Sequence, residues 1–105
     1  MFSDNFHEYS VLAFDLRDRK LVLKIQSEPD GTSKRTLVFS GVESVRVDGK
    51  PSGDNLGMVY PDGEILSINE VSNEVSIFVI WEDFDTQDFI TMSYEFKCDQ
   101  ITIDE

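Results

Sequence analysis

Apolar and polar residues alternate with a period of two along nearly the whole chain, which is the pattern of strands that bury one face. The alternation is clearest in residues 73–81, where Val75, Ile77, Val79 and Trp81 fall on one side. No stretch shows the spacing of a long amphipathic helix, in which apolar residues recur about every 3.6 positions. The chain is therefore expected to fold almost entirely into β-strands.

Turn-forming residues divide this pattern into short segments. In Pro29-Asp30-Gly31 and Tyr60-Pro61-Asp62-Gly63, Pro fixes φ and Gly accepts positive φ, and Asp48-Gly49 is a tight-turn dipeptide. Turn signals spaced by about 8–12 residues indicate an antiparallel β-sandwich or partly open barrel of seven to eight strands. Strands are expected within residues 9–16, 21–25, 35–39, 45–47, 64–70, 73–81, 89–96 and 101–103.

Three segments depart from simple alternation. Gly41 interrupts the pattern and predicts a bulge or corner. Residues 54–59 allow at most one short helical turn, with Gly57 weakening it. Phe78 and Ile80 make the second face of residues 73–81 apolar as well, so this strand is expected to be central and covered on both sides.

The length and the absence of special segments bound the class of protein. A chain of 105 residues supports one core, so residues 1–105 are expected to form a single acidic β-domain. No apolar run approaches the ~20 residues that cross a bilayer, and the polar N-terminus shows no signal peptide. Cys98 is the only cysteine, which excludes an internal disulfide. These features predict a protein of the reducing cytoplasm.

The net charge of −12 is unevenly distributed. Residues 1–53 hold eight acids and eight bases, whereas residues 54–105 hold thirteen acids and one base, Lys97. A drifted acidic surface is one explanation, and an electrostatic docking face for a basic partner is the other. Neither nucleic acid, which this charge would repel, nor a membrane is expected as a partner.

The chain offers little catalytic or metal-binding chemistry. His7 and Cys98 are the only residues of their kinds, too few for a zinc site and without spacing that indicates a thiol–imidazole couple. Residues 83–88 begin like a calcium loop, but Gln87 and Asp88 stand where an acidic or amide residue and a glycine are required. We therefore expect no enzyme activity, no catalytic residue, no metal and no cofactor.

Acidic and aromatic residues alternate in one short segment near the C-terminal third. Acids steer a charged partner, and aromatic side chains supply the anchors that dominate binding energy. Trp81 and Phe89 are expected to be core residues flanking this segment, and Phe84 is expected to be exposed. The candidate contact residues are Asp83, Phe84, Asp85 and Asp88, followed by Glu82, Asp62, Glu64 and Glu70. A second acidic patch, whose distance from the first depends on the strand order, comprises Asp54, Asp62, Glu64, Glu70 and Glu74.

The chain resembles the small β-rich immunity proteins of bacterial toxin systems, including contact-dependent growth inhibition. The resemblance rests on the opening Asn5-Phe6-His7-Glu8-Tyr9-Ser10, on Leu37-Val38-Phe39-Ser40-Gly41-Val42, and on the overall form of about a hundred acidic residues without catalytic equipment. It implies a cognate toxin, commonly a nuclease and here preferably a ribonuclease, held in a one-to-one complex. Its motifs are loose and structural, so they assign no binding residues.

Two other functions remain open from the sequence. One is a small-ligand or carbohydrate-binding β-sandwich with a concave face lined by aromatics such as Trp81 and Tyr94. The other is a subunit of a larger assembly whose acidic half faces a basic neighbour. A flat or convex acidic patch would favour the inhibitor over the ligand-binding module.

Overall fold

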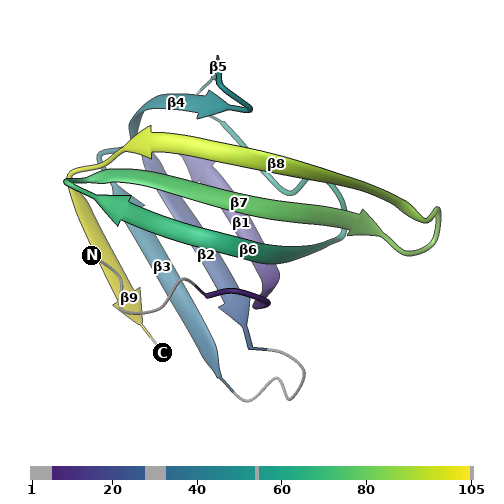
Figure 1. Ribbon diagram of the computed structural model, residues 1–105. Helices are drawn as coiled ribbons and strands as arrows, with labels where there is room; N and C mark the ends of the chain where they lie inside the picture. The colour runs from purple at the N-terminus through teal and green to yellow at the C-terminus, as the bar shows by residue number, and fades with distance from the viewer. Residues whose placement is uncertain (1–5, 28–32, 54, 105) are drawn as a thin grey trace.

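The computed structural model describes residues 6–27, 33–53 and 55–104. These residues form nine strands and no helix, which confirms the expected all-β class (Figure 1). The strands are β1 (Ser10–Arg17), β2 (Lys20–Gln26), β3 (Lys34–Ser40), β4 (Glu43–Val47), β5 (Lys50–Pro51), β6 (Asp62–Val71), β7 (Glu74–Asp83), β8 (Asp88–Lys97) and β9 (Gln100–Asp104).

All nine strands belong to one antiparallel sheet in the order β5-β4-β8-β7-β6-β1-β2-β3-β9. The sheet has two edges, β5 and β9, and is not closed. The two-residue strand β5 brings the number to nine, against the seven to eight expected. The predicted final strand over residues 101–103 is confirmed as edge strand β9.

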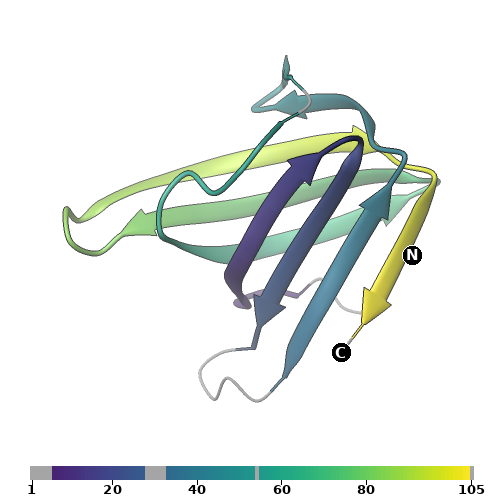
Figure 2. The same cartoon turned by 180° about the vertical axis from the view of Figure 1, so that it is seen from behind.

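The sheet bends over on itself into two facing layers. Strands β4, β8, β7 and β6 cross over β1, β2, β3 and β9, as the two opposite views show (Figures 1 and 2). The register between β1 and β6, where the layers join, contains the single pair Ser10 and Glu64. Each layer therefore buries one face against the other, which is how an antiparallel sheet makes a core without helices.

Aromatic side chains interlock between the layers. Phe14 of β1 meets Trp81 of β7 edge-on, with ring centroids 5.7 Å apart, and lies 4.7 Å from Tyr94 of β8. Phe39 of β3 meets Phe96 of β8 in the same edge-on manner at 5.3 Å. Arrangements of this kind contribute about 0.5–1.5 kcal/mol per pair beyond the area they bury.

Bulges explain why strict alternation fails in two strands. The register of β6 against β7 shifts between Ile65 and Ser67, so Ile65 and Ile68 are both buried although they are three residues apart. A similar shift early in β1 allows Val11 and Phe14 both to face the core. One extra residue in a strand reverses the face of every residue that follows it.

Gly41 forms the predicted corner between β3 and β4. It adopts a φ of +69°, which a residue with a Cβ rarely tolerates. The side chain of Asp99 occupies the space where a Cβ on Gly41 would lie. Close approach and backbone conformation therefore both require glycine at this position.

One local prediction was wrong. Strand β7 is interior to the sheet, but its second face is not covered, because Phe78 is 40% exposed and no helix or third layer lies over it in the described residues. Residues 55–59 form no helical turn; the N–H of Leu56 donates to the carbonyl of Leu16 at 3.1 Å, and the N–H of Leu16 donates back at 2.9 Å.

Gly63 provides the space for the buried indole of Trp81, its cross-strand partner. A methyl group at position 63 would lie 2.6 Å from Cε3 of that ring. We expect Gly63→Ala to lower the free energy of unfolding by about 1–3 kcal/mol through overpacking. Urea unfolding measures this, with Gly57→Ala as the control because that position faces open space. Equal stability of the two variants would contradict the packing argument.

Candidate interaction surface

The β7–β8 hairpin projects beyond the rest of the sheet (Figures 1 and 2). Its strands pair continuously from Glu74 and Lys97 to Asp83 and Asp88. Trp81 is fully buried, but its partner Ile90, which faces the same side, is already 42% exposed. The hairpin therefore leaves the core at this pair, and the residues beyond it are available to solvent.

Hydrogen bonds within the hairpin loop fix its shape. A carboxylate oxygen of Asp83, Oδ1, accepts from the backbone N–H of Asp85 at 3.0 Å and of Thr86 at 3.4 Å. The hydroxyl of Thr86 donates to Asp88 at 2.9 Å. Gln87 takes a φ of +63° as the chain enters β8. The carboxylate of Asp83 thus has a local structural role, whereas that of Asp85 forms no hydrogen bond or ion pair within the described residues.

The register brings acidic residues from three strands to this end of the molecule. Asp62 of β6 lies directly opposite Glu82 of β7, and Asp83 lies directly opposite Asp88 of β8. Directly opposed side chains are about 4.5–5.5 Å apart at Cβ, so each like-charged pair destabilises the sheet. We call this the hairpin-end surface and define it as Asp62, Glu64, Glu82, Asp83, Phe84, Asp85, Asp88 and Phe89.

None of the acids of the hairpin-end surface forms an ion pair within the part of the chain that the structure describes. Their pairing across strands increases the local negative potential instead of neutralising it. The surface therefore carries a concentration of negative charge that no described ion pair neutralises.

The structure does not bring Glu70 into this surface. Glu70 lies near the opposite end of β6, roughly 25 Å from Asp62 at about 3.3 Å per residue. Its carboxylate accepts from the backbone N–H of Asn73 at 2.9 Å. Glu74 lies at the same far end and is 4.0 Å from the ammonium of Lys97. The predicted second patch is thus divided between two ends of the strand, and its member Asp54 lies outside the described residues.

A hollow of about 530 Å³ opens beside the hairpin end. Its lining includes the carboxylates of Asp62, Glu64 and Glu82 and the apolar side chains of Leu12 and Phe84. A second hollow, of about 190 Å³, is lined by both Phe84 and Phe89 together with neighbouring loop residues. Acidic and aromatic groups are therefore adjacent in space as well as in sequence.

The sequence prediction is right for the exposure of Phe84 and wrong for that of Phe89. Phe84 is 69% exposed, which confirms the prediction, and Trp81 is buried as expected. Phe89 was expected in the core but is also 69% exposed. It lies opposite Glu82, and opposed residues share a face, so its ring points away from the core.

Phe78 and Phe89 are the exposed aromatics that sequence reasoning missed. Alternation from Val75 to Trp81 already places Phe78 on the face opposite the core. Since no long helix was predicted, no element of sufficient size was available to cover that face, and this signal could have identified Phe78 as exposed.

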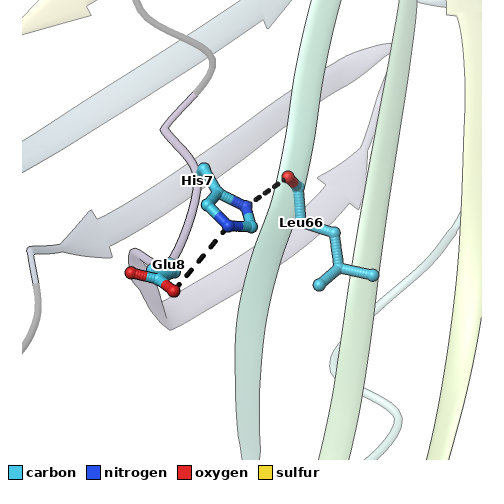
Figure 3. A network of polar contacts seen from close by, with 3 residues as sticks. All are labelled: His7, Glu8 and Leu66. Carbon is cyan, nitrogen blue, oxygen red and sulfur yellow. Dashed lines mark hydrogen bonds and ion pairs between the residues drawn. The ribbon is translucent and has the colours of Figure 1, made fainter.

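His7 and Cys98 do not form a catalytic couple. The imidazole Nδ1 of His7 lies 2.9 Å from the carbonyl oxygen of Leu66, and its Nε2 lies 3.7 Å from the carboxylate of Glu8 (Figure 3). Cys98 is buried, and burial, followed by the charges of Glu70 and Asp99, raises the pKa of its thiol. The described residues contain no group of three or more metal-ligating side chains.

Trp81 and Tyr94 do not line an open groove. Both are buried, and Nε1 of Trp81 donates a hydrogen bond of 2.8 Å to the hydroxyl of Tyr94. Burial raises the pKa of Tyr94, the hydrogen bond from Trp81 opposes this, and the charge of Asp48 adds to the rise. These aromatics serve the core and leave no concave stacking face of the kind a sugar would need.

Comparison with known proteins identifies no relative: no family model, no curated protein and no solved structure matches the chain. Within the described ranges, no helix has the length and apolar character needed to span a bilayer.

The folded protein should tolerate loss of the negative charge at Asp83, but not loss of the side-chain oxygen that accepts the two loop hydrogen bonds. We expect Asp83→Ala to lower the free energy of unfolding by about 1 kcal/mol, because two loop N–H groups lose their acceptor. Asp83→Asn keeps an acceptor and removes repulsion with Asp88, so its stability should equal or exceed that of the parent. Thermal melts together with amide hydrogen exchange at Asp85 and Thr86 measure both effects, and faster exchange in Asp83→Asn would contradict them.

Cys98 should react slowly with iodoacetamide in the folded protein. The thiolate is the reactive form, and a raised pKa keeps the thiol protonated. The raised pKa also makes the free energy of unfolding depend on pH. The contribution of the thiol is fully present below the pKa that Cys98 has in the unfolded chain, and it is lost as the pH rises through the pKa that Cys98 has in the folded protein. Mass spectrometry of labelling with and without denaturant, near the ordinary thiol pKa of about 8.5, tests this. Rapid labelling of the folded chain would show that the thiol is accessible and ionised.

Proposed function

We propose that this chain is an immunity-type inhibitor that acts in the cytoplasm by binding one basic protein toxin, and that it is not an enzyme. The proposal is supported chiefly by the hairpin-end surface. Acids that the sequence scatters between Asp62 and Asp88 converge there, and no described cation pairs with them. Like charges held together cost stability within the protein, and a cationic partner would compensate for that cost.

The distribution of charge over the two layers supports steered association. Buried Leu21, Leu23 and Ile25 alternate along β2 with Lys20 and Lys24, so these lysines point outward from the other layer. Six of the nine lysines and arginines lie between Arg17 and Arg35, in the layer of β1, β2 and β3. The other layer has only Arg46, Lys50 and Lys97 and carries the unpaired carboxylates at its end, so a partial dipole runs between the layers. Such a dipole turns the hairpin end toward a positively charged target during approach.

A nuclease is the toxin class that fits this surface best. Its active site must attract phosphate and is therefore basic. A projecting hairpin can enter a cleft that a flat sheet could only cover, and the exposed ring of Phe84 at its tip supplies an aromatic anchor. Carboxylates would then occupy the positions of phosphate groups. A ribonuclease is preferred among nucleases.

The proposal predicts capture and inhibition of a basic nuclease. The protein is used as bait in lysate of the organism that encodes it, at low and moderate salt, and the captured polypeptide is purified separately. We expect that polypeptide to degrade RNA or DNA, and an equimolar amount of this protein to stop the reaction. Glu82→Lys and Asp85→Lys should each weaken inhibition about tenfold or more, since close interfacial charge pairs couple by about 1.5–7 kcal/mol.

The matched control is Asp104→Lys, which changes the net charge equally but lies on edge strand β9, across the molecule from the hairpin end (Figure 1). Equal weakening of inhibition by all three variants would mean that the net charge of the protein, and not the hairpin-end surface, determines binding. A captured protein that is neutral or acidic, or a basic one whose activity is unaffected, would contradict the inhibitor function. Stable self-association without such capture would favour a subunit of a larger assembly.

A further inference from the structure

The outer face of the β6–β7–β8 layer carries an exposed apolar strip. Phe78 and Ile80 lie two residues apart on β7, opposite Ser93 and Thr91 of β8. Phe89 of β8 lies opposite Glu82, on the same face, because cross-strand partners share a face. We call Phe78, Ile80 and Phe89 the outer strip; Phe78 is 40% and Phe89 69% exposed, and Ile80 is half-buried.

These side chains are close enough to form one surface. Ile80 is diagonal to Phe89 across the β7–β8 ladder, at a typical separation of about 7–8 Å that large side chains bridge. Carboxylates border the strip on the β6 side, where Glu64 lies opposite Ile80 and Asp62 lies opposite Glu82. The result is an apolar centre whose rim is acidic on the β6 side and neutral on the β8 side, where Ser93 and Thr91 lie.

Exposed apolar residues are concentrated in this hairpin. Of the eight large apolar side chains exposed among the described residues, Phe78, Phe84, Phe89 and Ile90 belong to β7, β8 or the loop between them. Scattered exposed apolar residues need no explanation, but a contiguous group with a polar rim is characteristic of a protein interface. Aromatic anchors surrounded by polar residues supply most of the binding energy in such interfaces.

We propose that the outer strip docks the apolar centre of the partner's contact surface, and that lysines or arginines around that centre pair with Glu64, Glu82 and Asp62. This inference rests on the proposed function and adds to it a second contact beside the hairpin tip. The partner's chemistry follows from charge complementarity, because the β6 side of the rim is acidic and has no described counterion.

A second copy of this chain is a poorer occupant. Each copy carries a net charge of −12 and the same acidic border, so two copies that meet at their outer strips repel one another. Removal from water would strengthen that repulsion. A basic surface with an apolar centre encounters attraction at both the strip and the rim.

Three synthetic peptides of equal length test the strip directly, without a known toxin. They alternate Arg with Phe, Arg with Ser, and Asp with Phe. We expect the Arg–Phe peptide to bind about tenfold more tightly than the Arg–Ser peptide and to shift the backbone amide resonances of Phe78, Ile80 and Phe89. The Asp–Phe peptide should not bind. Phe78→Thr and Phe89→Thr should each reduce Arg–Phe binding about tenfold.

Val71→Thr is the matched control, because Val71 is also an exposed apolar strand residue but lies at the opposite end of β6. Threonine suits strands, so melting temperatures should show that all three variants remain folded. Equal affinity for the Arg–Phe and Arg–Ser peptides, or unchanged affinity in the strip variants, would overturn the assignment. So would a concentration-dependent dimer, seen by analytical ultracentrifugation, that Phe89→Thr abolishes.

Inhibition of a captured nuclease separates this inference from the proposed function. Full inhibition by Phe78→Thr and Phe89→Thr, with loss in Glu82→Lys, would refute the strip contact and leave the inhibitor function standing. Peptide binding that depends on the strip, with no nuclease inhibited, would support the docking surface and refute the inhibitor function.

Discussion

The contact of Trp81 with Phe14 fixes how the two layers of the sheet lie on one another. The register between β1 and β6 contains one residue pair, and Ile65 of β6 adds backbone hydrogen bonds of 2.8 Å with Glu8 and Tyr9, just before β1. The junction is short, so side-chain packing contributes much of what sets the angle between the layers. Phe14 comes from one layer and Trp81 from the other, and Tyr94 contacts Phe14 through its ring and Trp81 through its hydroxyl. The small residue Gly63 makes room for the indole. A change in any of these four residues therefore acts on both layers.

The position of Trp81 also determines where the candidate surface begins. The ladder of β7 and β8 continues two residue pairs past the pair formed by Trp81 and Ile90. Ile90 faces the core side but is only partly covered, which shows that the opposite layer ends there. The loop beyond must hold itself together, and Asp83 and Thr86 do so with local hydrogen bonds. Exposure of the hairpin end is thus a consequence of core packing, because the hairpin is longer than the layer beneath it.

Sequence reasoning located the long strands because alternation and turn residues are local properties. It could not determine which acids meet, because that depends on register. Val71 pairs with Glu74 at the tight turn of the β6–β7 hairpin, and an unbroken ladder would then place Asp62 opposite Asp83. The bulge in β6 shifts the pairing by one residue and places Asp62 opposite Glu82 instead. A single extra residue that no local pattern marks therefore decides the composition of the surface.

Acidic and apolar side chains on the same hairpin restrict each other's partners. β7 is paired with β6 and β8 along almost its whole length, so another molecule can approach Phe78 only from the face. Residues 88–92 of β8 pair with β7 alone, because β4 reaches only the other half of β8, so Phe89 can be approached from that edge as well as from the face. An apolar face alone would attract many surfaces, including its own copy. Glu64 and Glu82 lie beside this face. An acidic or neutral surface that bound there would remove their carboxylates from water without supplying a cation, which would weaken its binding. A cationic surface is the exception, because it also relieves the repulsion between Asp62 and Glu82 that the folded chain already bears. Part of the binding free energy would then come from relief of the repulsion between Asp62 and Glu82, which exists before the partner binds. Burial of the apolar strip would supply the rest.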